Sequence, residues 1–219
     1  MPRGSPATRA GAKPTLVLFV RHGLTATTGK KLPGRARHLH LAEAGRRQAE
    51  AVARRLQRVP RIAAVYASPL ERARETAQPI AASRGLSVRV EPALSDLDVG
   101  EWTGRSLGRL RRRREWPLIQ RHPSGFRFPG GESFAEMQAR MVSTVARLCA
   151  RHPGATIVVV SHADPIKAVV SHALGAHLDL FQRIAIAPGS VTAVAYRSLG
   201  PMVLTVNAVD GDAGWLEAR

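Results

Sequence analysis

The stretch 15-TLVLFVRHG-23 decides the fold of this chain. It follows Pro14 with six uncharged residues, which is typical of a strand buried on both faces of a sheet. The strand then gives way to an arginine, a histidine and a glycine, so polar chemistry stands directly after it. The stretch 156-TIVVVSH-162 has the same form and ends in a serine and a histidine. Both stretches predict interior strands of one sheet.

Strands and helices alternate along the rest of the chain. We expect strands at 15–20, 62–66, 88–90, 156–160, 191–196 and 202–206. We expect helices at 41–59, 68–83, 105–115, 132–150 and 165–174, with a cap at Ser68 and a kink at Pro79. This alternation predicts an α/β fold, a three-layer sandwich in which helices cover both faces of a mainly parallel central sheet.

The length of 219 residues predicts one domain with a sizeable core. We place that domain at 14–208, between a disordered basic tail at 1–13 and a C-terminal tail at 209–219. Within the domain, residues 95–131 are rich in glycine and arginine and only partly periodic. We interpret this segment as an excursion or lid that contains one short helix.

Composition excludes several classes of protein. Hydrophobic residues make up 44% of the chain and charged residues 22%, which excludes a disordered or collagen-like chain. The single cysteine, Cys149, excludes an intramolecular disulfide and a cysteine-rich zinc module, and its helical spacing favours a core position. No apolar run is long enough to span a bilayer or to form a signal peptide, so we expect a cytoplasmic protein that does not enter a membrane.

The formal net charge of +17 points to an anionic partner. Nucleic acid, an anionic membrane surface and a phosphorylated small molecule all fit that sign. The arginines are spread along the chain, and a coding bias toward arginine explains much of the surplus equally well. Charge alone therefore does not choose a function.

Reactive side chains follow three of the predicted strands. Arg21 and His22 follow the first strand, Arg72 lies four residues beyond Ser68, and His162 follows the fourth strand. Ligands of open α/β sheets bind at the carboxyl ends of the strands. If these strands are parallel neighbours, two imidazoles and two guanidinium groups meet at one edge.

The same residues carry a resemblance to a known family. The blocks 21-RHG-23 with Thr25, 68-SPLERARETA-77 and 161-SH-162 resemble the signatures of the histidine phosphatase superfamily, the phosphoglycerate mutase-like proteins. The likeness runs from residue 15 to residue 206. The stretches 128-FPGGES-133 and 178-LDLFQR-183 further resemble small actinobacterial members described as probable phosphomutases or phosphatases.

The resemblance implies phosphoryl transfer through a phosphohistidine. His22 is then the nucleophile, and Arg21, Arg72 and His162 surround the phosphoryl oxygens. The chemistry of the residues agrees, because forked guanidinium groups match the oxygens of a doubly charged phosphate. The resemblance implies no metal and no cofactor.

The family takes the proton for the leaving group from a glutamate, and here the pattern departs from it. Alignment on Gly100-x-Trp102-x-Gly104 places Asp96 at that position, so Asp96 is the expected acid. Its side chain is one methylene shorter, which puts the catalytic rate in doubt. Asp98 and Glu101 are the alternative acids, with loop solvation or capping as their other interpretation.

Further residues are expected at the substrate. Thr28 stands where many members have an asparagine that touches the phosphate, and a hydroxyl still donates to phosphate. Arg35, in the loop beyond it, is expected to add a substrate contact. Ala163 replaces the usual glycine after the second histidine and tightens the space behind His162.

The basic run at 111–114 has two interpretations. It is an exposed helix face, or it belongs to a lid that supplies cations to a second anionic group of the substrate. His38, His40, His172 and His177 lack the carboxylates or cysteines that complete a metal site, so no metal is expected there. Trp102 and Trp116 are expected to pack the excursion.

The sequence thus predicts a metal-independent phosphatase that hydrolyses a small phosphomonoester through His22. A mutase of the phosphoglycerate mutase type and a phospho-ligand-binding protein with a weakened site are the alternatives. Specific nucleic-acid binding is the remaining class, and only the net charge supports it. The partner is a small phosphorylated substrate, and the sequence leaves the oligomeric state open.

Overall fold

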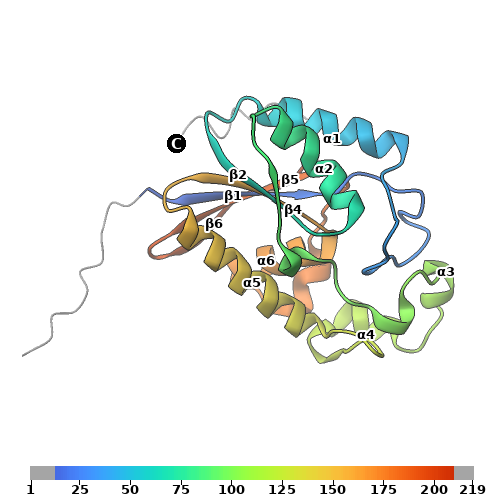
Figure 1. Cartoon of the computed structure of the whole chain (residues 1–219). Helices are drawn as coiled ribbons and strands as arrows, with labels where there is room; N and C mark the ends of the chain where they lie inside the picture. The colour runs from blue at the N-terminus through green and yellow to red at the C-terminus, as the bar shows by residue number, and fades with distance from the viewer. Residues whose placement is uncertain (1–12, 210–219) are drawn as a thin grey trace, which may run out of the picture.

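The computed structural model describes residues 13–209, which form a six-stranded sheet between two layers of helices (Figure 1). The strand order is β3-β2-β4-β1-β5-β6. The strands are β1 (Thr15–Arg21), β2 (Ile62–Ala67), β3 (Val88–Val90), β4 (Thr156–Ser161), β5 (Val191–Arg197) and β6 (Gly200–Ala208). The first four strands are parallel, whereas β5 runs antiparallel to β1 and β6 antiparallel to β5. The predicted fold class and all six predicted strands are confirmed.

Two helices cover each face of the sheet. In Figure 1, α1 (Glu43–Leu56) and α2 (Glu71–Ala82) lie on one face, and α5 (Phe134–Arg151) and α6 (Ala163–Ala173) lie on the other. The short helices α3 (Leu107–Leu110) and α4 (Trp116–Arg121) extend beyond the end of the sheet. Single 3₁₀ turns are found at Pro92–Leu94, Gly100–Trp102 and Pro123–Gly125, and a longer one at Leu178–Arg183.

The continuous apolar run of β1 exists because both of its faces are buried. Leu18 and Val20 pack with the core under α1 and α2, and Val17 and Phe19 pack with the core under α5 and α6. All four side chains have no exposed surface. Since alternate residues of a strand point to opposite faces, only a run without polar side chains satisfies both layers.

The excursion at 95–131 has an apolar core of its own. Its buried aromatic rings pack edge to face on one another, and Phe128 contacts Phe134 of α5 in a tilted pair. The whole cluster consists of Trp102, Phe126, Phe128, Phe134 and Phe181. Trp102 is 1% exposed. Aromatic pairs of this geometry stabilise by about 0.5–1.5 kcal/mol each beyond their burial. The expected packing role of Trp102 is confirmed, and the segment is anchored to the domain.

The predicted start of the second helix is wrong. The helix α2 begins at Glu71 with Leu70 as its N-cap residue, and the Ser68 hydroxyl accepts from the N–H of Leu70 at 3.3 Å and contacts His162 Nε2. Pro79 lies inside α2 without ending it, and the helix continues to Ala82. Residues 68–70 stay extended because the chain must leave the edge of the sheet before a helix can start. This requirement comes from the tertiary structure, so local cap preferences do not predict it.

Other boundaries also differ from the predictions. The expected helix at 105–115 is confined to Leu107–Leu110, and the arginine run after it forms turns, so the four arginines do not share a helix face. The helix α4 was not predicted, α1 is shorter at both ends, and α6 begins two residues early. Ser133 and Glu136 form a capping box that starts α5 at Phe134. The helix α3 ends where the arginine run begins, because four consecutive arginines offer no apolar side chains that could pack against the core and stabilise further turns.

Of the predicted tails at 1–13 and 209–219, all but Lys13 and Val209 lie outside the described residues. The first strand begins at Thr15 and the last ends at Ala208. Within residues 13–209, no helix has the length and apolar character needed to cross a membrane.

Candidate active site

The strand order brings the three reactive strand ends to one edge of the sheet. The strand β4 lies between β1 and β2, and all three are parallel. The backbone N–H of His22 donates to Ser161 O at 3.0 Å, and the N–H of Ser68 donates to Val160 O at 3.0 Å. These ladder hydrogen bonds fix the backbone on each side of His162, so the side chains that follow the strands are aimed by the sheet itself.

His22 and His162 face each other below the surface. Their ring centroids are 5.1 Å apart with an interplanar angle of 60°, and they are 4% and 1% exposed. His22 Nδ1 lies 2.8 Å from Gly23 O. Because a carbonyl oxygen only accepts, Nδ1 carries the hydrogen and Nε2 keeps its lone pair. The backbone therefore selects the tautomer that a nucleophilic imidazole requires.

Both imidazoles are neutral at physiological pH. Burial, and after it the neighbouring Arg72 and Arg21 guanidinium groups, lower the pKa of His22 to about 3. Burial and the same arginines, together with His22, hold the pKa of His162 well below its usual value. An unprotonated His22 retains the lone pair needed to attack an electrophile.

Arg72 lies fully buried between two segments that follow different strands. Its Nη2 donates to Gly34 O at 2.7 Å and to Asp96 Oδ2 at 3.2 Å, and its Nη1 donates to Ala36 O at 3.3 Å. Arg21 is held from the other side, where Nη1 donates to Ile186 O at 2.6 Å. Burial lowers the pKa of Arg21, although that of an arginine stays far above neutrality.

Three buried nitrogens around His22 have no hydrogen-bond partner among the described residues. They are Arg21 Nε and Arg72 Nε, which are donors, and His162 Nδ1, which is a donor in the tautomer whose Nε2 accepts from Ser68 Oγ. An unpaired buried donor costs about 1–3 kcal/mol, so native proteins rarely keep several in one place without a use. Several unpaired donors fixed at one place can bind an anion that has several oxygen acceptors.

Asp96 lies in this group as the expected acid. Its Oδ2 is 3.6 Å from His162 Nδ1, and its Oδ1 accepts from the N–H of Leu97 at 2.9 Å. Burial raises the pKa of Asp96 to about 6; Arg72 opposes that rise and Asp164 adds to it. A carboxyl group with this pKa holds a proton through mildly acidic pH and can also release it.

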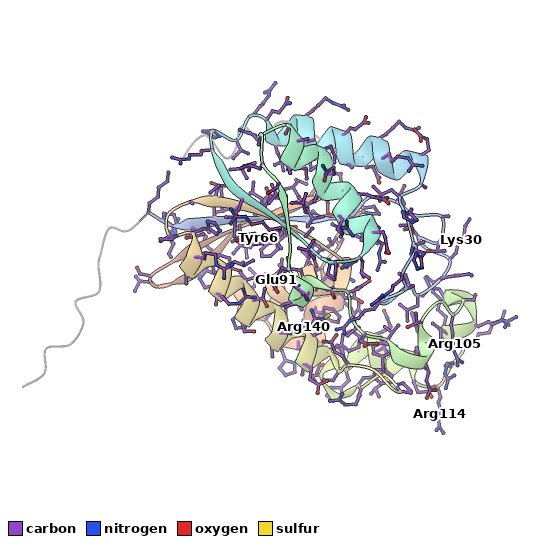
Figure 2. All side chains as sticks on the ribbon, in the orientation of Figure 1. Lys30, Tyr66, Glu91, Arg105, Arg114 and Arg140 are labelled. Carbon is purple, nitrogen blue, oxygen red and sulfur yellow. The ribbon has the colours of Figure 1, made fainter. Side chains whose placement is uncertain are left out.

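The segment that carries Asp96 is fixed by a buried glutamate. Glu132 accepts from Arg140 Nε at 2.8 Å and from Arg35 Nη2 at 3.0 Å, and also binds the N–H of Asp98 at 3.0 Å. Arg140, labelled in Figure 2, extends from α5 and donates to the backbone carbonyls of Ala93 and Ser95. The backbone on both sides of Asp96 is therefore tied to α5.

Arg35 belongs to that network. Its Nε donates to Asp96 O at 3.0 Å and its Nη1 to Asp98 Oδ2 at 3.3 Å, and Nη2 binds Glu132. Each of its three nitrogens thus donates to a protein oxygen, which favours a positioning role over the expected substrate contact. The Asp98 carboxylate also accepts from the N–H of Gly100, as its loop-capping interpretation predicts.

Thr28 lies in the loop after β1, where its hydroxyl accepts from the N–H of Thr25 at 3.0 Å. The side chain orders this loop, and its contact with a phosphate stays a prediction. Glu101 is exposed on the excursion.

Sequence reasoning missed Ser68 and Thr76. Ser68 Oγ is 2.8 Å from His162 Nε2 and orients that ring. Thr76 Oγ1 accepts from the N–H of Gly23 at 3.1 Å and donates to Arg72 O at 2.7 Å, so it joins two blocks of the site. The sequence does contain one indication of the role of Ser68. Ser68 directly follows a predicted strand, as His22 and His162 do, and this position fits a site residue as well as a helix cap.

Three of the remaining histidines contact carboxylates at the surface. His40 Nδ1 forms a hydrogen bond with Glu75, and His122 and His177 both contact Asp179. No group of three or more metal-ligating side chains occurs in the part of the chain that the structure describes.

This strand order and this set of buried histidines and arginines define a class of phosphoryl-transfer protein. The family model of the histidine phosphatase superfamily (branch 1) matches residues 17–209, and the chain belongs to that superfamily.

Individual relatives narrow the comparison. A bifunctional protein of Mycobacterium tuberculosis is 36% identical over 184 residues, which cover 79% of this chain and 50% of the relative. The chain thus spans about half the length of that relative. The probable phosphoglycerate mutase GpmB of Cronobacter sakazakii is 31% identical over 92% of this chain and 95% of its own length. The solved mycobacterial glucosyl-3-phosphoglycerate phosphatase has a TM-score of 0.80 at 25% identity, covering 90% of this chain and all of that one.

Proposed function

We propose that this protein hydrolyses a small phosphomonoester through a phosphohistidine formed on His22. The observation that carries the proposal is the set of three unpaired buried donors, on Arg21, Arg72 and His162, around a neutral imidazole. A phosphoryl group brings three oxygens that accept hydrogen bonds from such donors. Its negative charge also offsets the buried guanidinium charges.

The first step transfers the phosphoryl group to the protein. His22 Nε2 attacks phosphorus in line, a nitrogen–phosphorus bond forms, and the bond to the leaving oxygen breaks. Asp96, protonated up to a pH near 6, gives its proton to the leaving alkoxide. The products of this step are the alcohol, the phosphohistidine and an Asp96 carboxylate.

The second step returns the protein to its starting state. The Asp96 carboxylate takes a proton from water as the water oxygen attacks phosphorus, and the nitrogen–phosphorus bond breaks. Inorganic phosphate leaves, His22 is again neutral, and Asp96 again carries the proton. The same carboxyl group thus serves as acid and then as base.

The two arginines and His162 stabilise the charge that develops on the equatorial oxygens. At an effective dielectric constant of 20, one charge pair at 4 Å is worth about 4 kcal/mol. Backbone carbonyls hold the two arginines, and the Ser68 hydroxyl holds His162, before substrate arrives, so little reorganisation is needed in the transition state.

The test is a panel of phosphorylated metabolites with radiolabelled phosphate. We expect label on the protein after a rapid quench, stable to alkali and labile to acid, and release of inorganic phosphate in steady state. We also propose that no metal takes part and that the protein acts in the cytoplasm; turnover in EDTA tests the first point and fractionation of cells the second.

A mutase is the second candidate, because the relative from Cronobacter sakazakii bears that name. In a mutase the label returns to the organic product instead of appearing as free phosphate. Binding of phosphorylated ligands without a phosphohistidine or turnover indicates a site that only binds. A third outcome is binding of nucleic acid that falls steeply with salt and persists in a His22→Ala variant. That result would support a nucleic-acid-binding protein, the function for which only the net charge argues.

A further inference from the structure

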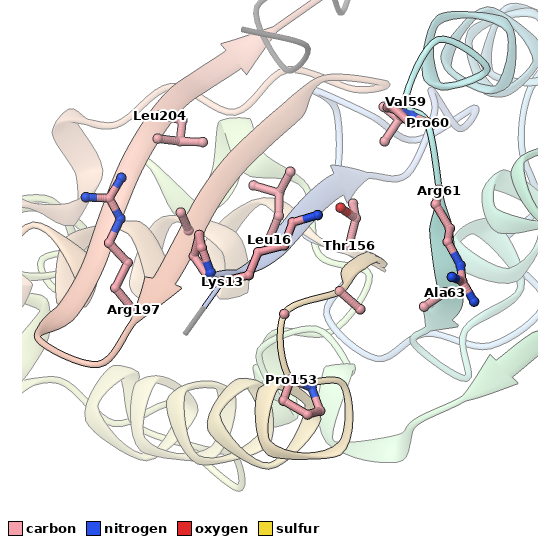
Figure 3. A pocket seen from close by; sticks show the side chains of 14 residues that line it. Lys13, Leu16, Val59, Pro60, Arg61, Ala63, Pro153, Thr156, Arg197 and Leu204 are labelled. Carbon is pink, nitrogen blue, oxygen red and sulfur yellow. The ribbon is translucent and has the colours of Figure 1, made fainter. Parts of the chain in front are cut away.

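A cavity of about 670 Å³ lies at the edge of the sheet opposite to the histidines (Figure 3). It is bounded by the first residues of β1, β2 and β4 and by parts of β5 and β6. Cavities of 300–1,000 Å³ are the size that proteins use to bind small molecules. From Leu16 in the cavity, β1 runs on for six residues to His22, a distance of about 20 Å. The cavity is therefore separate from the candidate active site.

The floor of the cavity is apolar. Leu16 and Leu204 are half-buried on it and pack against the core under α1 and α2. Ala63 lies on the opposite side and packs against the other core, and Val59 and Ala195 complete the apolar lining. A ligand with an apolar body would remove the exposed parts of Leu16, Ala63 and Leu204 from water, at about 25 cal/mol for each Å² buried.

The rim of the cavity is cationic. Figure 3 shows Lys13, Arg61 and Arg197 around it, from three separate strands or their approaches. Thr15 pairs with Tyr196, so Arg197 lies next to Lys13, whereas Arg61 stands on the far side of the cavity. The side chains of Lys13 and Arg197 form no hydrogen bond or ion pair with any residue in the described range 13–209, and none of the described lining residues is Asp or Glu. Like charges gathered without a counter-charge repel one another, so an anion placed among them is stabilised.

We propose that this cavity binds a small organic anion with an apolar body, of the size and chemistry of a medium-chain fatty acid. The carboxylate contacts Lys13 and Arg197, and the chain lies over Leu16 and Leu204. The N-terminal segment 1–12 does not complement the site, because it carries Arg3 and Arg9 and no acidic residue. The proposal does not depend on the phosphatase activity.

The experiment is calorimetric titration of the full chain with octanoate, with octan-1-ol as the neutral probe. We expect one octanoate site and at least tenfold weaker binding of the alcohol. Equal affinity for the two probes would show that the cations take no part and would overturn the proposal.

Charge-reversal variants locate the site. The double variant Lys13→Glu with Arg197→Glu should weaken octanoate binding at least tenfold, and both side chains are exposed, so the fold is retained. The matched control is Arg111→Glu with Arg112→Glu, which changes the net charge equally on the excursion and should change affinity less than twofold. Equal losses in both double variants would mean that net charge alone attracts octanoate.

Competition separates this site from the histidines. Orthovanadate, an anion that resembles phosphate, should leave octanoate binding unchanged, whereas displacement by vanadate would place octanoate at the arginines of the candidate active site. A structure of crystals grown with octanoate is the last experiment. Octanoate in the cavity supports the proposal, and residues 1–12 or a second copy of the chain filling the cavity would overturn it.

Discussion

Two groups of arginines in this protein have the same chemistry and different surroundings. Arg21 and Arg72 follow the sheet edge, and Arg72 is fully buried with its fork fixed by Gly34 O, Ala36 O and Asp96. The four arginines at 111–114 are all exposed, and Arg113 pairs with Glu115 and lies 5.0 Å from the Trp102 ring. Arg72 and Arg21 help to lower the pKa of both buried histidines, whereas, among the described residues, the exposed run lowers the pKa only of the adjacent surface residue Glu115. Water screens the exposed charges, so their effect does not reach a buried site. The net charge of +17 therefore indicates less about function than the positions of two arginines, Arg21 and Arg72.

The largest effect is expected from removing the buried nucleophile. We predict that His22→Ala lowers kcat by about 10⁵-fold with the fold retained, because no other described group at the site has an unprotonated nitrogen aimed like Nε2. His172→Ala is the matched control, since His172 is exposed on α6 and should leave turnover unchanged. Steady-state release of phosphate and circular dichroism provide the measurements. Unchanged hydrolysis by His22→Ala would exclude it as the nucleophile.

The next effect comes from the buried carboxyl group and depends on pH. Because the pKa of Asp96 is raised to about 6, its acid form is lost above that pH, and kcat/KM for an alkyl phosphate should fall there. Asp96→Asn should remove this decline and lower the rate by about 10²–10⁴-fold.

An aryl phosphate is the control for Asp96, because it has the same phosphate ionisation and a leaving group that needs no proton. Asp96→Asn should slow it far less. Equal slowing of alkyl and aryl substrates would contradict the acid role.

The two groups of arginines are compared directly by Arg72→Ala and Arg112→Ala. Removing Arg72 leaves Asp96 without its buried partner, so we expect a loss of about 3–5 kcal/mol of unfolding free energy and about 10²–10³-fold in kcat/KM. Arg112→Ala should change stability by less than about 0.5 kcal/mol. Urea denaturation and steady-state kinetics measure both. A similar cost in the two variants would remove the distinction between buried and exposed arginines.

Arg35 is intermediate between the two groups and should give the smallest effect. Its side chain is 37% exposed, and it holds the Asp96 backbone and Glu132. Arg35→Ala should lower kcat for alkyl phosphates by about tenfold with KM unchanged, because only the position of the acid shifts. Arg35→Lys should restore part of kcat. A rise in KM with kcat unchanged would instead assign Arg35 to substrate binding.

The sequence predicted the sheet better than the connections. The runs 15–20 and 156–160 are apolar throughout because both faces of these strands are buried. Their local sequence pattern therefore predicts their place inside the sheet. The helix at 68–83 was placed too early because Ser68 looks like a cap, whereas its hydroxyl binds His162. The network of Arg35, Glu132 and Arg140 joins residues up to about a hundred positions apart, and no local pattern contains it.

What the sequence by itself determined is the set of strands, the residues that follow them and the family signature those residues form. Only the tertiary structure decided that β4 lies between β1 and β2, that three buried nitrogens stand unpaired around His22, and that Arg35 holds the backbone of Asp96. The physical reason is that strand periodicity is local along the chain, whereas burial, desolvation and hydrogen-bond satisfaction depend on segments that meet only after folding.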